Sequence, residues 1–553
     1  MLSSLQLNGL SPFGQATGTE VVVGLTLIPV SWILYKFLFY PLYLSPLSKI
    51  PGPPVSAIPF TGNFWDIFSS EAGYHQLNWS YKFPRMYVYH GLFNIPRVLL
   101  TDPDLIREVL VTNAYDYIKP PNVIKFLGKI VGEGLLIAEG SAHKHQRKHI
   151  QPSFNPSVLR SFVPSFFLHS AELVNLWKVD LIGEDKAEVN ILDGCSRATL
   201  DIIGTAGFGY AFHAIEDDED AEGEESPTLH WAYKTLLGPR SMLEQLLLTF
   251  LPFFRNLPLK RNFAHQKGLN VIRDTSRELV EKAKESRAAQ ETTEVDDGVL
   301  GPKDLLTVLV EQNDKGGLTD EELVGQVMTF LVAGHETTSV TLTWSLYQLA
   351  LDPDIQDKLR AEITPLFSKI DFNSPDFPNV PNLPTYEEMN ALPYLNNFCK
   401  EILRLIPPVP STTRVPAKDV VLNGYFIPKG TPMFFSPVVT HRHTHFWGDD
   451  VMDFRPERWD EAPAKDISPY TYFREYLEHS MSSQQRLIPS PAFLAGPRQC
   501  IGNRFALMEL KVLLCTVLYA YKFHEKPGYV VRKAQGVTWR PKPGMRLIIE
   551  RAQ

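Results

Sequence analysis

The sequence predicts a mainly α-helical protein with small β-sheets and an N-terminal transmembrane helix, and three observations lead to this fold class. Residues 21–44 form an apolar run in which Lys36 is the only charged residue. Helical patterns begin after Asp102 and Pro103 and fill most of the remaining chain. Short apolar and β-branched runs at residues 87–100 and after Tyr519 predict strands that build only small sheets.

The composition limits the class of protein further. The chain has 553 residues with ordinary apolar and charged fractions, as in a globular protein with a large core. Its formal net charge of −8 and its lack of a basic tail argue against a nucleic-acid binder. Four cysteines are too few for a disulfide framework, which indicates a reducing, cytosolic setting.

The apolar run at residues 21–44 has the length of a membrane-spanning helix, which needs about 20 residues. Trp32, Tyr35 and Tyr40 suit the boundary between lipid and water. A cleaved signal peptide is the alternative, but the apolar core is long for one and no basic segment precedes it. The proline-rich stretch at residues 50–54 is stiff and extended. We therefore predict a membrane anchor at residues 1–49 and one catalytic domain at residues 50–553.

Several segments of the large domain have helical patterns. Residues 140–152 are rich in bases, residues 199–212 are apolar and end in glycine-rich turns, and residues 263–290 are charged and amphipathic. Residues 319–322 form a capping box, and the long apolar helix that follows is expected to end ahead of Asp352 and Pro353. The acidic run at residues 216–225 and the stretch at residues 291–301 are expected to be surface loops.

Cys500 lies in a run with the spacing Phe-x-x-Gly-x-Arg-x-Cys-x-Gly. A thiolate at this position is able to ligate haem iron. Gly496 and Gly502 let the backbone pass close to a bulky ligand, and the Arg498 guanidinium suits a carboxylate such as a haem propionate. An apolar run follows, so Cys500 is expected just before a helix N-terminus that stabilises a thiolate. An inert buried cysteine is the alternative, which the five matching positions disfavour.

This signature, from Phe493 to Gly502, resembles that of the haem-thiolate monooxygenases, the cytochrome P450 family. The resemblance implies the cytochrome P450 fold and a haem b whose iron is ligated by the Cys500 thiolate, with Phe493, Gly496 and Gly502 around the cofactor. The sequence contains no Cys-x-x-Cys-His, so the haem is expected to be bound without covalent attachment to cysteine.

Glu336 and Thr337 lie inside the long apolar helix and follow a pair of small residues, Ala333 and Gly334. Small residues cost helix stability but let oxygen and substrate approach the backbone. Glu336 and Thr337 supply an acid and a hydroxyl for proton delivery to dioxygen, and we predict that they are catalytic. A zinc motif His-Glu-x-x-His is rejected, because Ser339 occupies its last position.

Three arginines are expected to hold the haem propionates. Arg498 belongs to the cysteine signature, Arg147 matches the propionate partner of the family's basic helix, and Arg414 occupies the family's second propionate-binding position. The position four residues before Arg147 is usually Trp in the family, and here it is His143, which departs from the pattern.

Glu401 and Arg404 lie three residues apart on one helix face. They resemble the family's Glu-x-x-Arg motif, whose customary partner is Arg458 here. The implied cluster of Glu401, Arg404 and Arg458 is structural and is expected to lock the core behind the haem.

Two groups of histidines raise the question of a further metal. His145 and His149 are four residues apart on the basic helix, and surface histidines are the simpler interpretation because no carboxylate or thiolate accompanies them. His441, His443 and His445 alternate, so a strand would align them, but the family pattern here gives a second metal little support.

The resemblance implies a monooxygenase that inserts one oxygen atom of O2 into an apolar small molecule. Electrons are expected from an NADPH-dependent flavoprotein reductase. A proline-rich hinge after an anchor marks, in the family, a single-pass enzyme of the endoplasmic reticulum whose catalytic domain faces the cytosol. The sequence is similar in style to fungal members that act on secondary metabolites such as terpenoids.

Two alternatives remain open. One is a haem-thiolate isomerase or peroxygenase that needs no reductase, and the intact pair of Glu336 and Thr337 disfavours it. The other is a non-catalytic haem-binding membrane protein, which the complete set of site positions disfavours.

Three further segments have weaker interpretations. Residues 466–485 form a polar insertion between Trp459 and Cys500 to which no function is assigned. The resemblance places a mobile lid over the substrate at residues 243–259, where an ordinary core helix is the alternative. A basic face that docks the reductase, or else an ordinary solvated surface, is expected from Lys144, Arg147, Lys148, Arg504 and Lys511.

Overall fold

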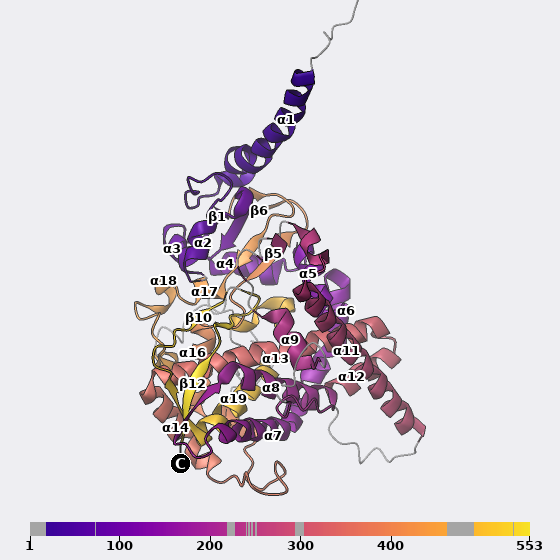
Figure 1. Ribbon diagram of the computed structural model, residues 1–553, viewed down its shortest axis with the longest axis vertical. Helices are drawn as coiled ribbons and strands as arrows, with labels where there is room; N and C mark the ends of the chain where they lie inside the picture. The colour runs from indigo at the N-terminus through magenta and orange to yellow at the C-terminus, as the bar shows by residue number, and fades with distance from the viewer. Residues whose placement is uncertain are drawn as a thin grey trace, which may run out of the picture.

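A computed structural model describes residues 18–461 and 491–552, except for residues 72, 218–226, 239–240, 242–243, 245–246, 249–250, 293–303 and 535. The insertion at residues 466–485, most of the acidic run, the loop at residues 293–301 and several positions of the expected lid lie outside the described residues. The described chain forms one body from which a single helix projects (Figure 1).

The projecting helix is the predicted anchor. It consists of α1 (Gly18–Leu34) and continues without a break as the π-helix η1 (Tyr35–Leu44), followed by the short turn η2 (Pro46–Lys49). Within the described residues, Thr26–Lys49 is the one stretch long and apolar enough to cross a membrane, and most of its residues are exposed. Pro41 lies inside η1 and has no N–H group for a helical hydrogen bond, which explains the widened helix there.

Helices form most of the body, as predicted. The described helices beyond the anchor are α2 (Phe64–Ser69), α3 (Tyr74–Lys82), α4 (Pro103–Arg107), α5 (Pro121–Val131), α6 (Gly140–Ile150), α7 (Pro156–Asp180), α8 (Ile191–Ile202), α9 (Leu229–Leu237), α11 (Lys260–Thr292), α12 (Leu305–Asp314), α13 (Asp320–Leu351), α14 (Pro353–Phe367), α15 (Tyr386–Ala391), α16 (Pro393–Leu405), α17 (Pro437–Thr440), α18 (Thr444–Trp447) and α19 (Asn503–Ala520).

The strands form small sheets, as predicted. The largest has the order β1-β2-β8-β5-β3, in which only β2 and β8 are parallel. A three-stranded antiparallel sheet has the order β4-β12-β9, and two hairpins pair β6 with β7 and β10 with β11. The strands are β1 (Met86–His90), β2 (Pro96–Leu100), β3 (Tyr117–Ile118), β4 (Lys186–Asn190), β5 (Thr412–Pro416), β6 (Val420–Leu422), β7 (Tyr425–Ile427), β8 (Met433–Phe435), β9 (Tyr521–Glu525), β10 (Arg532–Lys533), β11 (Pro541–Lys542) and β12 (Arg546–Arg551).

The long helix α13 runs through the middle of the body (Figure 1). Thr319 and Glu322 form the predicted capping box, in which each side chain accepts the backbone N–H of the other residue. The helix ends at Leu351, directly ahead of Asp352 and Pro353, as the sequence predicts. Most of its residues are buried on every side because α7, α8, α16 and α19 share one hydrophobic core with it. This central position makes α13 a rigid support for the site.

Candidate haem site

Cys500 lies in the loop that leads into α19, as predicted. Its backbone N–H donates to the Phe493 carbonyl at 2.8 Å, which closes the loop. Cys500 is the only one of the four cysteines whose side chain is exposed. Protein nevertheless surrounds the thiol closely and raises its pKa, while a hydrogen bond from the Gly502 backbone and the charge of Arg147 act in the opposite direction. The loop therefore presents one accessible sulfur.

The two glycines of the signature meet different neighbours. Gly496 has a φ of +73°, and a Cβ there would collide with the Leu110 carbonyl oxygen in the π-helical turn η4 (Glu108–Thr112). Gly502 is the N-cap of α19, and the nearest atom to an added Cβ is Phe154 Cε1 at 3.5 Å, an ordinary contact. Gly496 is therefore required by a neighbouring backbone, whereas no described protein atom requires glycine at position 502.

The three predicted arginines converge beside the cysteine loop. Arg147, on α6, donates to the Gln499 carbonyl next to Cys500. Arg498 donates to the Glu139 carboxylate. Arg414, on β5, is buried close to Arg498, and burial together with the neighbouring positive charge lowers its pKa to about 10.

The cluster holds more positive than negative charge. Among the charged groups that act on His143, three are cations, Lys119, Arg498 and Arg147, and one is the Glu139 carboxylate. Arg498 Nε is buried and has no hydrogen-bond partner. Buried cations that lack enough carboxylates, together with a free buried donor, fit an anionic group such as the two propionates of haem b. The residues present therefore fit this cofactor.

His143 is buried within the same cluster, with 2% of its surface exposed. Its Nδ1 atom lies 3.1 Å from the Tyr115 hydroxyl. Burial and the surrounding cations lower its pKa to about 4, so the ring is neutral at neutral pH. A neutral ring adds no further charge to the cluster, which makes the departure from the family pattern compatible with an anionic cofactor.

The Glu336 carboxylate contacts Arg540 and Thr538, and the sequence does not predict these contacts. The carboxylate accepts two hydrogen bonds from Arg540, one of them from Nε at 2.7 Å, and a third from Thr538 Oγ1 at 2.7 Å. Burial alone would raise the pKa of Glu336, but Arg540 and Thr538 outweigh it and lower the pKa below 4.5. Glu336 is therefore an ionised carboxylate in this arrangement.

Thr337 donates to the Ala333 carbonyl at 2.8 Å, four residues earlier in α13. The small residue at Gly334 has a packing role, because a Cβ there would lie 3.0 Å from the side chain of Ile203 in the turn η6 (Ile203–Gly207). The structure thus places Glu336 and Thr337 side by side along one helix, with their polar atoms engaged by different partners.

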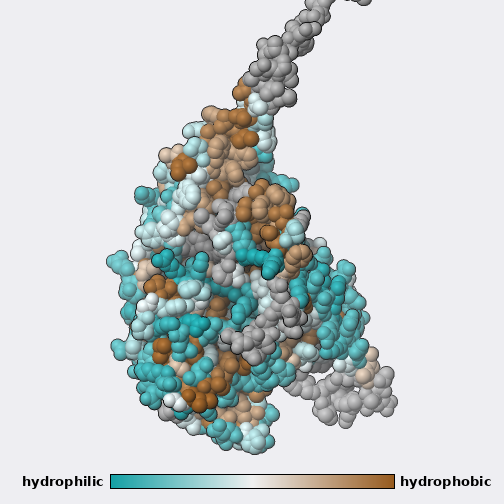
Figure 2. Space-filling view, viewed as in Figure 1, coloured by the Kyte–Doolittle hydropathy of each residue, from teal (hydrophilic) through white to brown (hydrophobic). Residues whose placement is uncertain are grey.

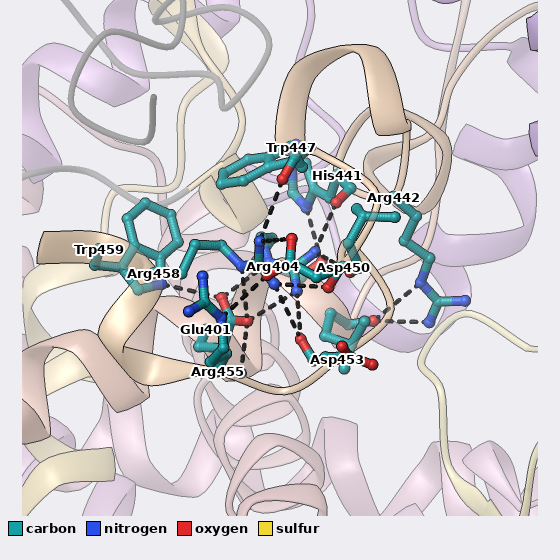
Figure 3. A network of polar contacts seen from close by, with 12 residues as sticks. Glu401, Arg404, His441, Arg442, Trp447, Asp450, Asp453, Arg455, Arg458 and Trp459 are labelled. Carbon is teal, nitrogen blue, oxygen red and sulfur yellow. Dashed lines mark hydrogen bonds and ion pairs between the residues drawn. The ribbon is translucent and has the colours of Figure 1, made fainter. Parts of the chain in front are cut away.

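The third group, Glu401, Arg404 and Arg458, forms the buried network of Figure 3. Arg404 holds Glu401 through two hydrogen bonds of 2.8 Å, and both side chains are fully buried. Arg458 Nε lies 3.4 Å from Glu401 Oε1. Arg404 also donates to the Val451 carbonyl at 2.7 Å. The network ties α16 to the loop at residues 441–459, as its predicted structural role requires.

The histidines are engaged in packing. His441–His445 lie in the turns around α17 and α18, so the expected strand is wrong, and His441 Nδ1 faces the Arg404 carbonyl at 3.1 Å. His145 is exposed and His149 is half-buried on α6, and their rings contact Gly317 and Gln312 near the end of α12. Within the described ranges, the only group of three possible metal ligands is His169, Glu172 and Asp201.

That group has its ligand atoms engaged already. His169 contacts Glu172 at 2.6 Å and Thr205 at 2.5 Å through its two ring nitrogens. The Asp201 carboxylate accepts backbone N–H groups from Ala214 and Ile215. These contacts explain the cluster as a clamp between α7, α8 and the chain that follows.

Sequence reasoning missed Lys119, Glu139 and Glu509, as well as the contacts of Thr538 and Arg540 with Glu336. Glu509, on α19, is fully buried, and neither carboxylate oxygen has a hydrogen-bond partner. Burial raises its pKa well above 4.5, which favours the protonated form. An acid within an apolar helix was a usable signal for Glu509. The other four belong to segments without a local motif.

One residue of the expected basic face, Lys511, is buried, so its predicted surface position is wrong. Lys511 is 3% exposed and donates to Asn390 and Asn396 at 2.6 Å, so it packs α19 against the chain around α15. Lys144 and Lys148 are exposed on α6, and Arg504 is half-buried. The basic surface is therefore smaller than predicted.

Comparison with known proteins agrees with this geometry. The family model of cytochrome P450 matches residues 51–547. The chain is 32% identical to cytochrome P450 monooxygenase sphH of Aspergillus fumigatus, across 96% of this chain and 93% of the relative. It is 32% identical to cytochrome P450 monooxygenase FUM15 of Gibberella moniliformis, across 90% and 86% of the two chains.

A third relative, cytochrome P450 monooxygenase 205 of Postia placenta, is 31% identical across 94% of this chain and 95% of the relative. Proteins of this family bind haem b through a cysteine thiolate and incorporate oxygen from O2 into their substrates. The family match, the relatives and the mainly helical fold with small sheets agree: this chain belongs to the cytochrome P450 family and is a haem-thiolate monooxygenase.

Proposed function

We propose that Cys500 is the haem ligand, that Arg147, Arg414 and Arg498 hold the propionates, and that Glu336 and Thr337 deliver protons during oxygenation of an apolar small molecule. The observation that carries this proposal is the buried excess of positive charge beside Cys500, with Arg498 Nε lacking a partner. A dianionic cofactor whose metal is ligated by the cysteine satisfies both features.

When bound, the haem supplies activation of dioxygen. The chain's own residues hold the cofactor and manage protons. The arginines neutralise the propionates in a buried setting, where charge-assisted hydrogen bonds are strong. Neutral His143 keeps Tyr115 in place beside Arg498, whose guanidinium lies 4.8 Å from the Tyr115 ring centroid.

Proton delivery by Glu336 requires a rearrangement. The carboxylate is bound by Arg540 and Thr538, so it carries no proton to give. We propose that Arg540 releases Glu336 during the reaction, which raises the pKa of the buried carboxyl and lets it take up a proton. Thr337, one residue further along α13, then has to release the Ala333 carbonyl and donate its hydrogen bond to another acceptor.

We further propose that electrons come from an NADPH-dependent flavoprotein reductase and that residues 1–49 anchor the catalytic domain, residues 50–553, to the endoplasmic reticulum with that domain in the cytosol. The apolar helix at Thr26–Lys49 supports the anchor. The substrate is proposed to be a fungal secondary metabolite such as a terpenoid. The fungal origin of the relatives supports this class.

The test combines spectroscopy with turnover. The reduced chain under carbon monoxide is expected to show the absorption of a thiolate-ligated haem, and Cys500→Ser is expected to abolish it. Cys399→Ala, at a buried cysteine of α16, is the matched control and should keep it. NADPH consumption and product formation are then measured with and without the reductase.

The outcomes separate the alternatives. Product that appears only with NADPH and reductase supports the proposal. Turnover without reductase would indicate an isomerase or a peroxygenase instead. A thiolate spectrum without turnover of any apolar substrate would contradict the proposed substrate class.

A further inference from the structure

The membrane anchor meets the catalytic domain at a specific contact. Pro41 lies inside η1 and interrupts its backbone hydrogen bonding, because proline has no N–H group. The Asn94 side chain donates to this Phe37 carbonyl at 2.8 Å. Asn94 is 2% exposed, so the bond is shielded from water. The domain thus supplies a side-chain donor to a backbone carbonyl of the anchor, close to the position of Pro41.

The residues that make this contact have an unusual backbone. Asn94 ends the short turn η3 (Leu92–Asn94), in which Phe93 and Asn94 have φ values of 58° and 51°. Such left-handed conformations are strained for a residue like Phe and persist only when the surroundings hold them. The Phe93 ring lies 5.5 Å from the Phe37 ring, and its backbone N–H donates to the Phe60 carbonyl. The turn is therefore held from both sides, by the domain and by the anchor.

The contact at Phe37 lies inside the apolar stretch Thr26–Lys49 and directly after α1, which we take as the part that crosses the bilayer. The α-helical part, α1, has 17 residues. Its length is about 25 Å, slightly less than the roughly 30 Å of a hydrocarbon core. Trp32 lies in the last turn of α1 and Lys36 follows the helix, with Lys36 Nζ 4.5 Å from the Trp32 ring centroid. Aromatic and basic side chains are typical of the lipid–water boundary.

Exposed apolar side chains gather around this exit. Figure 2 shows hydrophobic surface at the base of the anchor and on neighbouring parts of the body. The hairpin of β6 and β7 contributes Val421 and Phe426. It lies beside η2, the turn that directly follows the anchor helix. The collar is defined by four exposed side chains: Tyr43 (71% exposed), Ile95 (42%), Val421 (67%) and Phe426 (47%). A patch continuous with a membrane anchor has lipid as its nearest apolar partner.

We propose that the turn Leu92–Asn94 is a clamp that fixes the direction of the anchor, so that the collar rests on the lipid surface. The partner is the interfacial region of a bilayer. The clamp makes the anchor a rigid support that sets the tilt of the catalytic domain. This inference rests on the proposed membrane anchoring.

The experiment uses the full-length holoenzyme in vesicles of phosphatidylcholine and phosphatidylserine. A cysteine introduced by Val421→Cys carries an environment-sensitive fluorophore, and quenching by lipids with spin-labelled headgroups is measured. The unsubstituted chain is the labelling control. The spatial control is Val179→Cys in the last turn of α7, which Figure 1 shows at the end of the body away from the anchor.

Asn94→Asp tests the clamp, because Asp keeps the size and tolerates the left-handed backbone but cannot donate to Phe37. Loss of one shielded hydrogen bond is expected to lower the docked population about fivefold, seen as weaker quenching at position 421. Phe37→Ala is the second variant. It lies on the anchor and removes the ring contact without changing the catalytic domain, whose folding is checked by thermal unfolding.

Strong quenching at position 421 that weakens in both variants supports the proposal, provided that position 179 stays unquenched. Equal quenching in the unsubstituted background and in both variants overturns the clamp. No quenching at position 421 in vesicle-bound enzyme overturns the lipid contact of the collar. Failure of the full chain to sediment with vesicles overturns the anchoring itself, a result that the other outcomes do not resemble.

Discussion

Glu336 and Arg540 form a buried ion pair, with side-chain exposures of 4% and 11%. The charge of each side chain offsets the desolvation cost of the other. A buried pair of this kind adds little stability relative to apolar residues, yet removal of one partner leaves an unpaired buried charge. Replacing one partner should therefore lower the free energy of unfolding far more than replacing both, which distinguishes the pair from a surface salt bridge.

We expect Arg540→Gln to lower the free energy of unfolding by about 3 kcal/mol at pH 7, because Glu336 then remains buried without its cation. Glu336→Gln combined with Arg540→Gln should recover most of the loss. The native pKa of Glu336 lies below 4.5. Its stabilisation is thus present above that pH and is lost as the pH falls through the native pKa.

Urea unfolding of the parent enzyme and the two variants at pH 7 and at pH 4 measures this prediction. The difference between the parent enzyme and Arg540→Gln should narrow at the lower pH. A double variant as unstable as the single one would show that Arg540 stabilises the fold by packing rather than by charge.

The contribution of Glu509 to the free energy of unfolding changes with pH in the opposite direction to that of Glu336. Burial raises its native pKa well above 4.5, so the native state holds a proton that the unfolded state releases. The contribution to stability is therefore complete below pH 4.5 and declines as the pH rises. We expect Glu509→Gln, which cannot ionise, to gain stability relative to the parent between pH 5 and pH 8.

Melting temperatures at several pH values test this expectation. Parallel curves for the two proteins would mean that Glu509 keeps an ordinary pKa in the native state.

At the scale of elements, the network around Glu401 joins α16 to the loop that ends with Trp459. The Arg455 backbone N–H and the Trp459 indole both donate to Glu401, at 3.0 Å and 3.1 Å. Arg404 places its remaining donors on carbonyls of the same loop. The carboxylate therefore organises a whole segment that has little regular structure of its own.

We expect Glu401→Gln to destabilise the fold by about 3 kcal/mol, since an amide has one acceptor oxygen in place of two and leaves Arg404 buried without a counter-charge. Arg455→Ala is the control, because its guanidinium is 39% exposed and bonds mainly to Glu461 and Asp450. Thermal unfolding and haem retention after gel filtration measure both. Comparable losses in the two variants would contradict a special role of the carboxylate.

The sequence predicts an element well when its signals are local. Thr319, Glu322 and Pro353 define the ends of α13 through capping and through the missing N–H of proline. The strands at residues 87–100 follow from short apolar and β-branched runs. The run of three histidines at residues 441–445 misleads because its alternation resembles a strand, whereas buried contacts to α16 determine its backbone.

The site is predictable only where a motif carries it. Cys500 and the three arginines are found from their spacing and family resemblance. The bond from Arg540 to Glu336 spans 204 residues and the bond from Arg498 to Glu139 spans 359 residues, and no periodic pattern links such distant positions. Lys511 was assigned to the surface by its charge, although two asparagine oxygens satisfy it in the interior.

At the scale of the whole molecule, the exposed cations of α6 lie on the side of the cysteine loop, because Arg147 of the same helix contacts Gln499. We expect Lys148→Glu to raise several-fold the reductase concentration needed for half-maximal turnover. Electrostatic complementarity acts mainly on the rate of encounter. The effect should shrink at high salt, since the screening length falls from about 10 Å at 0.1 M to about 3 Å at 1 M ionic strength.

Lys186→Glu, on β4, is the matched control, since Figure 1 shows the three-stranded sheet and α6 on opposite sides of the body. Its turnover should match that of the parent at every reductase concentration. Equal effects of the two substitutions would indicate a response to net charge alone and would contradict a docking face on α6.

The order of the three-stranded sheet has a consequence for biosynthesis. β12 is the last strand of the chain and lies between β4 and β9, so neither outer strand has a partner until it arrives. Arg546 on β12 contacts Glu188 on β4 across 358 residues. At ordinary rates of translation, β4 leaves the ribosome roughly 20 to 70 s before its partner. During that interval its free edge is open to wrong pairing, which makes this strand the place where nascent chains are most in need of a chaperone.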